Sequence, residues 1–212
     1  MATETKDAIF GKKERGLLLD PINDNNPVTV QILGVCSALA VTSQVYPALI
    51  MALGVTLVTG FSNLVTSALR KTIPASIRMI IQLLIVAVLV QVVEMLLGAF
   101  AYSAYEMLSV FIGLIITNCI VMGRLEAYAM ANKPWQSFLD GIGNGLGYGF
   151  ILVVMAVIRE LTGKGSFMGW RVLPADVYTV NNLMVLPCAS LFLIGILIWI
   201  QRSANRKLID VS

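Results

Sequence analysis

The chain has 212 residues, of which 58% are hydrophobic and 13% charged, and its mean hydropathy is +0.84. This leaves too little polar surface for a soluble globule of this size and indicates an integral membrane protein. The net charge of +3 is scattered and gives no basic face for nucleic acid. Histidine is absent, which excludes Ser-His-Asp triads, His-ligated zinc and bis-His haem.

The first 28 residues mix acidic and basic side chains and lack the apolar core and cleavage site of a signal peptide. We expect residues 1–28 to be a retained tail. Because cytoplasmic loops carry an excess of Lys and Arg, the tail is placed in the cytoplasm. Twelve of the 15 basic residues then lie inside, and Arg159, Lys164 and Arg171 lie outside.

Charge-free runs predict the membrane spans, because about 20 mostly apolar residues are needed to cross the hydrocarbon core. The first run, from Thr29 to Leu69, is long enough for two helices with a break at residues 43–47. In chain order we expect six helices, near residues 29–45, 48–69, 77–97, 107–122, 143–158 and 182–200. The sequence therefore predicts an all-α membrane domain over residues 29–202, with a cytoplasmic tail at 203–212.

Each half of this domain, residues 29–97 and 107–200, holds three predicted helices. An odd number of crossings reverses direction, so we expect the halves to be inverted repeats. The first helix of each half is interrupted by small or polar residues around a cysteine, Cys36 in one and Cys119 in the other. Such paired interruptions indicate broken helices that meet near the midplane. Cys36 and Cys119 are therefore expected to approach each other.

The residues alone leave two roles open for these cysteines. Cysteine is a small apolar residue that often only fills space in a helix, which is the structural interpretation. The alternative is ligation of a metal or cluster by thiolates. An iron–sulfur cluster usually needs four cysteines, and the third cysteine here, Cys188, lies away from the symmetric pair. One chain would supply half of such a site, and a second membrane chain the other half.

Four segments carry a resemblance to a known family. They are DNNP at 24–27, QILGVCSALAVT at 31–42, LIITNCIVMGRLEAYAM at 114–130 and FLDGIGNGLGYGF at 138–150. Together they closely resemble the D-type membrane subunits of the bacterial sodium-translocating NADH:quinone reductases. The corresponding subunit of the Rnf electron-transport complex is similar and stays an alternative. The glycine-rich segment after Asp140 resembles the Rnf subunit less than it resembles the reductase subunit.

The resemblance implies a place in a six-subunit respiratory complex of the bacterial inner membrane. It implies a paralogous partner of opposite orientation, the E-type subunit, and an intramembrane [2Fe-2S] cluster to which each of the two chains gives two cysteines. The ligands in this chain would be Cys36 and Cys119, with flavins and the NADH and ubiquinone sites on other subunits. The chain would carry electrons, coupled to Na⁺ export, without catalysing a reaction alone. A small secondary transporter or a scaffold without a cluster is the competing interpretation.

Charged residues beside the spans add a second candidate site. We predict that Asp140 caps the helix that follows it and that Arg124 and Glu126 are solvated loop charges. Glu94 lies within a span, where it is either functional or reaches the interface. Glu94 outside and Asp140 inside would bracket a Na⁺ path with oxygen ligands. The glycines at 141–149 have the i, i+4 spacing of close helix packing and no nucleotide-loop pattern.

Overall fold

The computed structural model describes residues 16–18, 20–21, 25–100, 111, 113–167, 170–171 and 186–204. This part of the chain is helical apart from β1 (Ser166–Phe167) and β2 (Trp170–Arg171), which pair antiparallel. The helices are α2 (Val35–Val41), α3 (Val45–Leu69), η1 (Ala75–Ile77), α4 (Arg78–Phe100), α6 (Cys119–Arg124), η2 (Leu125–Ala129), α7 (Pro134–Lys164) and α9 (Pro187–Ala204).

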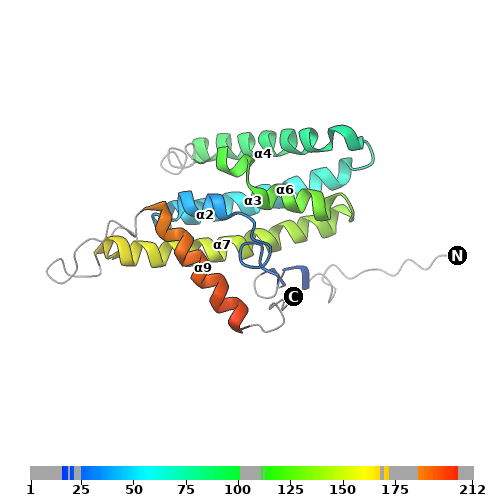
Figure 1. Ribbon diagram of the computed structural model, residues 1–212. Coiled ribbons are helices and arrows are strands. Elements are labelled where there is room, and N and C mark those ends of the chain that lie inside the picture. The colour runs from blue at the N-terminus through cyan, green and yellow to red at the C-terminus, as the bar shows by residue number, and fades with distance from the viewer. Residues whose placement is uncertain are drawn as a thin grey trace.

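The centre of the molecule is the contact between α3 and α7, and α4 lies against α3 (Figure 1). The short helices α2 and α6 lie along this pair, on either side of its middle, and α9 crosses α7 obliquely. The buried apolar core is drawn mainly from α2, α3, α6 and α7, with smaller contributions from α4 and α9, and includes Met51, Ile120 and Leu152. The long helices α3, α4 and α7 thus form a helical frame against which the two short helices pack.

Glycines on one face of α7 allow α3 to approach closely. A Cβ at Gly145 would lie 2.6 Å from the Thr56 Cα, and one at Gly141 would lie 2.8 Å from the Thr59 carbonyl oxygen. On α3, the buried Thr56 and Thr59 hydroxyls donate to carbonyls one turn earlier, at 2.7 and 2.6 Å. The packing role predicted for the glycine segment is therefore confirmed.

A second face of the same segment holds the N-terminal part of the chain. A Cβ at Gly143 would lie 2.4 Å from the Leu17 carbonyl oxygen, and one at Gly147 would lie 2.5 Å from that of Pro21. The Asn26 amide donates to the Gly147 carbonyl at 3.1 Å, and its oxygen accepts from the Val28 N–H at 3.0 Å. These residues from before position 29 are thus packed against α7.

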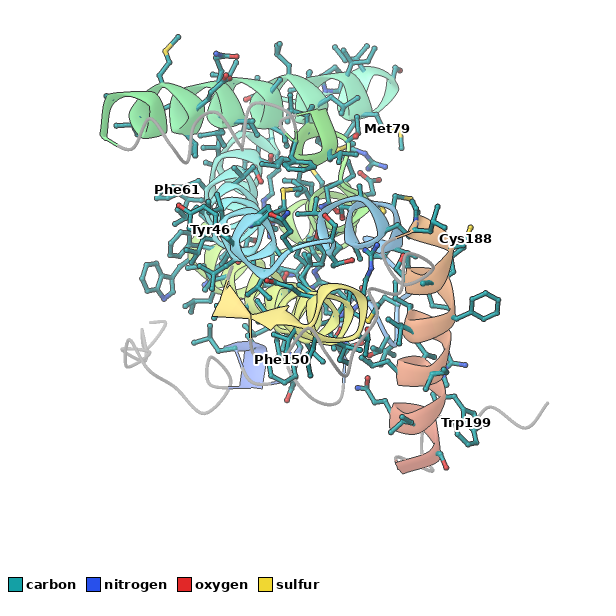
Figure 2. All side chains as sticks on the ribbon, turned by 90° about the vertical axis from the view of Figure 1, so that its left-hand side faces the viewer. Tyr46, Phe61, Met79, Phe150, Cys188 and Trp199 are labelled. Carbon is teal, nitrogen blue, oxygen red and sulfur yellow. The ribbon has the colours of Figure 1, made fainter. Side chains whose placement is uncertain are left out.

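Large apolar side chains are exposed on the outer helices of the described part. Met79, Ile80 and Met95 of α4 are 66–67% exposed, and Phe192 and Trp199 of α9 are 75% and 71% exposed. Figure 2 shows Met79 at the upper right and Trp199 at the lower right of the helix cluster. A helix that is hydrophobic on all sides and yet exposed to this extent fits hydrocarbon and not water.

Three described helices are long and apolar enough to cross a membrane, over residues Val45–Leu69, Arg78–Leu96 and Pro134–Gly163. A fourth apolar helix, Pro187–Ser203, is shorter. These correspond to the predicted spans at 48–69, 77–97, 143–158 and 182–200. The count of six crossings and the inverted relation of the halves stay predictions, because residues 101–110 and 172–185 lie outside the described part.

Several predicted bounds were wrong. The span expected at 29–45 is a helix only from Val35 to Val41, because Ile32 and Gly34 have φ angles of 57° and 78° and turn the chain out of a helix. The span expected at 143–158 is a 31-residue helix that starts at Pro134. Proline has no backbone N–H, but at the first helical position that N–H would have no partner within the helix. Pro134 can therefore start the helix, nine residues before the predicted start at 143.

Candidate functional site

Both cysteines lie in the first turn of a short helix that follows a break in the chain. Cys36 is the second residue of α2, after Gly34 in the left-handed region, and Cys119 is the first residue of α6. Before α6, Asn118 has an extended backbone, and its side chain accepts a hydrogen bond from the Ile120 N–H at 3.1 Å. The interruptions predicted in the first and fourth spans are thus present at the cysteines.

The two cysteine turns touch each other. The Gly34 N–H donates to the Cys119 Sγ at 3.1 Å, across 85 positions of sequence. A Cβ at Gly34 would lie 2.5 Å from the Ile120 Cδ1 and 3.1 Å from the Tyr148 ring. Glycine is required here twice over, for its left-handed backbone and for the space that it leaves.

A buried hydroxyl pair supports this contact from α7. The Tyr148 hydroxyl lies 2.7 Å from the Ser37 Oγ, which donates to the Gly34 carbonyl at 2.9 Å. The Asn118 amide donates to the same Ser37 Oγ at 3.3 Å. All three side chains are at most 3% exposed. One helix therefore holds both cysteine turns through a single serine.

The donor set of this region fits half of a metal or cluster site. Cys36 is exposed, Cys119 is partly exposed, and neither forms a disulfide. Within the described residues, no group of three or more His, Cys, Asp or Glu side chains could hold a metal ion. Two accessible thiols on adjoining turns can hold an iron–sulfur cluster only if another chain supplies the remaining ligands. Cys188 is exposed and is the second residue of α9, so it belongs to neither turn.

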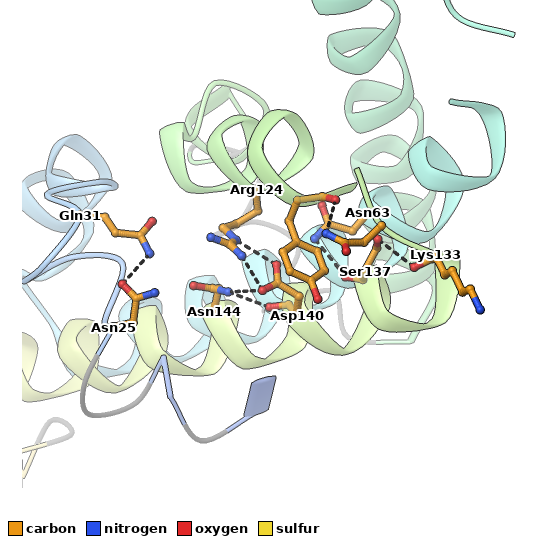
Figure 3. A network of polar contacts seen from close by, with 10 residues as sticks. Asn25, Gln31, Asn63, Arg124, Lys133, Ser137, Asp140 and Asn144 are labelled. Atoms are coloured by element: carbon orange, nitrogen blue, oxygen red, sulfur yellow. Dashed lines mark hydrogen bonds and ion pairs between the residues drawn. The ribbon is translucent and has the colours of Figure 1, made fainter. Parts of the chain in front are cut away.

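Asp140 is not a helix cap. It lies within α7, six residues after Pro134, and is 2% exposed. The Arg124 guanidinium donates to both of its carboxylate oxygens, at 2.9 and 2.5 Å, and the Asn144 amide donates to Asp140 Oδ1 at 3.1 Å (Figure 3). The expectation that Arg124 is a solvated loop charge was therefore wrong as well.

Glu126 contacts the start of α4, whereas Glu94 lies near the other end of that helix. Glu126, in the π-helical turn η2, forms an ion pair with Arg78 at the start of α4 and accepts from Gln82 at 3.1 Å. Glu94 lies sixteen residues beyond Arg78 along α4 and is half-buried. Asp140 and Glu94 are therefore near opposite ends of the helical frame, and the structure does not bring them together.

Two consecutive charged residues of α7 hold the turn between α2 and α3. The Arg159 guanidinium donates to the Thr42 hydroxyl at 2.6 Å and the Leu39 carbonyl at 3.4 Å, at the C-terminal end of α2. The Glu160 carboxylate accepts from the Val45 N–H, the first of α3, at 2.9 Å. The Arg159 cation thus faces a helix C-terminus and the Glu160 anion faces a helix N-terminus. The helix dipole favours each charge at that end.

Sequence reasoning missed several of these residues. Ser37 and Asn118 stand beside the two cysteines and appear in the sequence only as polar interruptions. Tyr148 carries no signal, because it is one aromatic residue among the glycines of α7. The pairing of Arg124 with Asp140 has no signal either, since residues 16 apart share no helix-face or strand spacing that would predict a contact.

The helical frame, its apolar exterior and the two broken turns define a helical membrane protein that presents a pair of thiols. A family model described as "Rnf-Nqr subunit, membrane protein" matches residues 15–198, and the chain belongs to this family. The resemblance seen in the sequence is thereby confirmed.

The chain is similar throughout to several curated relatives, each named as the D-type subunit of a "Na(+)-translocating NADH-quinone reductase". The relative from Shewanella sp. (strain ANA-3) is 56% identical over 205 residues, which cover 95% of this chain and 98% of the relative. The one from Pseudomonas paraeruginosa is 54% identical over 200 residues, 92% of this chain and 90% of the relative. The one from Tolumonas auensis is 55% identical over 191 residues, 88% of this chain and 89% of the relative.

Proposed function

We propose that the chain is the D-type subunit of a sodium-translocating NADH:quinone reductase and that it carries electrons through the membrane interior. The three relatives carry the name of this subunit and match over most of their length, which supports it over the Rnf subunit. The enzyme activity belongs to the complex, an oxidoreductase, and this chain catalyses no reaction alone. Its place is the inner membrane, with both termini in the cytoplasm.

Cys36 and Cys119 are proposed to give two of the four ligands of a [2Fe-2S] cluster shared with a paralogous chain, the E-type subunit. The observation that carries this is the hydrogen bond from the Gly34 N–H to the Cys119 Sγ, because it joins the two thiol-bearing turns. When bound, such a cluster takes up one electron and releases one. The chain's part is to hold the thiolates and to donate a backbone N–H to one of them.

A transporter or scaffold without a cluster gives a different expectation. Such a protein needs neither thiol, and its cysteines would tolerate serine. The exposure of Cys36 and the partial exposure of Cys119 argue against a role in filling space, since a cysteine that packs a core is buried. Flavins and the NADH and ubiquinone sites are assigned to other subunits of a six-subunit complex.

The test is the iron content and visible absorption of the complex purified through this subunit. Wild type is compared with Cys36→Ser and Cys119→Ser, and Cys188→Ser is the matched control, because that cysteine is exposed and lies on α9. We expect each of the first two variants to lose about two iron atoms per complex and the control to lose none. Unchanged iron in assembled Cys36→Ser and Cys119→Ser complexes would overturn the proposal.

A route for Na⁺ between Glu94 and Asp140 is proposed as part of the same function. Placement supports it, since the two carboxylates lie near opposite ends of the frame and are oxygen ligands suited to a hard cation. Arg124 restricts it, because its guanidinium occupies both oxygens of Asp140. A cation at Asp140 would have to compete with Arg124, so we assign Asp140 to gating of the route and Glu94 to its outer mouth.

A further inference from the structure

The hydrogen bonds around Ser37 can be assigned a direction. A serine hydroxyl has one proton and accepts two hydrogen bonds. Its proton is used on the Gly34 carbonyl, at 2.9 Å. The Tyr148 hydroxyl, at 2.7 Å, must then be the donor to Ser37, and the Asn118 amide is the second donor. The Ser37 hydroxyl is therefore saturated, with each partner on a different segment.

This arrangement fixes the backbone of Gly34. The Gly34 carbonyl accepts from the Ser37 hydroxyl and from the Ala38 N–H at 3.1 Å, while the Gly34 N–H donates to the Cys119 Sγ. Glycine has the widest choice of backbone angles, so its N–H points at the sulfur only while the rest of the residue is held. The Tyr148 ring also lies close to Gly34, because a Cβ there would be 3.1 Å from it.

A backbone N–H that donates to a ligating sulfur stabilises the thiolate and the added electron of a reduced cluster. Hydrogen bonds to the sulfurs are among the factors that set the potential of iron–sulfur centres, and partners of the ligands tune a metal site. Because the side chains of the network are at most 3% exposed, water cannot replace a lost partner easily.

We propose that Tyr148 and Ser37 are positioning residues that hold the Gly34 N–H on the Cys119 sulfur and so raise the reduction potential of the cluster. This inference rests on the proposed function, since it needs a cluster at Cys36 and Cys119. It assigns to α7, which carries no cysteine, a part in the redox chemistry.

The test measures the midpoint potential of the cluster by redox titration of the purified complex, followed by its absorption or electron paramagnetic resonance signal. Tyr148→Phe keeps the ring against Gly34 and removes only the hydroxyl, and Ser37→Ala removes the serine oxygen. Both variants are expected to keep their iron and to shift the midpoint to a more negative potential. Ser37→Thr keeps a hydroxyl, so its midpoint potential should stay near that of wild type, unlike that of Ser37→Ala.

Tyr46→Phe is the matched control, because Tyr46 is 43% exposed on α3 and should leave the potential unchanged. Unchanged potentials in Tyr148→Phe and Ser37→Ala would overturn this inference and leave the cluster assignment intact. Loss of iron from both variants would also overturn it, in favour of a purely structural role for the network. Iron retained in the Cys36→Ser and Cys119→Ser complexes would overturn the proposed function itself.

Discussion

Two ion pairs, Arg124 with Asp140 and Arg78 with Glu126, differ sharply in burial. The side chains of Arg124 and Asp140 are 13% and 3% exposed, whereas those of Arg78 and Glu126 are 39% and 36% exposed. Water screens the second pair and leaves it little net free energy, while the first pair has few alternatives to its own contact. The Arg124 guanidinium also lies 5.4 Å above the Tyr128 ring, which adds a cation–π contact.

The buried pair makes Asp140→Asn a costly change. Neutralising Asp140 leaves the Arg124 charge buried and unpaired, so we expect a loss of about 3–5 kcal/mol in the free energy of unfolding. Thermal unfolding of the detergent-solubilised protein measures it. If Asp140 gates the sodium route, the variant should also raise the Na⁺ concentration for half-maximal quinone reduction, as should Glu94→Gln.

Glu126→Gln is the control for the stability effect, because the same change in the exposed pair should cost at most about 1 kcal/mol. Equal losses in Asp140→Asn and Glu126→Gln would contradict the distinction by burial. A sodium dependence that neither Asp140→Asn nor Glu94→Gln alters would contradict the proposed route. Glu94→Gln separates the two effects, since half-buried Glu94 is not part of the Arg124 pair.

Among the elements, α7 is the one on which most of the structure depends. Its two glycine faces hold α3 and the N-terminal segment, its Tyr148 supports the cysteine turns, and its Arg159 and Glu160 hold the turn between α2 and α3. At 31 residues it is about 46 Å long at 1.5 Å per residue, which exceeds the hydrocarbon thickness. It therefore reaches both ends of the frame.

The glycine face gives a prediction for Gly145→Ala. The added Cβ would lie 2.6 Å from the Thr56 Cα, which is backbone and cannot turn aside, so α3 and α7 must separate. We expect a loss of about 1–3 kcal/mol, seen as a lower thermal midpoint. Gly195→Ala on α9 is the control, because a Cβ there meets nothing within 4 Å and should be neutral or slightly stabilising. Equal midpoints for the two variants would contradict close packing at Gly145.

Among the described residues, basic side chains of the loop after α3 gather at one end of the frame with residues of the segment before α7. Arg70 donates to the Asn132 carbonyl at 2.8 Å, and Arg78 pairs with Glu126, so the loop after α3 and the segment before α7 share that end. The basic residues of these loops are those that the positive-inside rule assigns to the cytoplasm. The structure groups them as the predicted topology requires, and the side of the membrane stays a prediction.

Reporter fusions test that topology. Fluorescent protein fused after Ser212 should be fluorescent and alkaline phosphatase fused there inactive, because the C-terminus is predicted to lie in the cytoplasm. Phosphatase fused after Lys164, at the C-terminal end of α7, should be active and serves as the matched control. An active phosphatase after Ser212 would place the C-terminus outside and contradict the topology of six spans.

The membrane environment of the protein, its family and the pair of cysteines could all be predicted from the sequence. Apolar runs and the scarcity of charge exclude a water-soluble fold whatever the packing, and polar interruptions in an otherwise apolar helix mark a break that must be satisfied locally. For that reason the interruptions at Cys36 and Cys119 are evident in the sequence. Spacing i, i+4 likewise predicts that the glycines of α7 pack against a neighbouring helix.

Only the fold shows which residues far apart in the sequence contact each other. The sequence predicts Asp140 as a cap because local pattern offers no partner 16 residues away, and burial beside Arg124 is a property of how α6 lies against α7. Tyr148 reaches Ser37 across 111 positions, and Gly34 reaches Cys119 across 85. Such contacts depend on the relative placement of whole helices, which periodicity within one helix does not contain. The residues that position the thiols therefore emerge from the packing of the helices, whereas the thiols themselves are already evident in the chain.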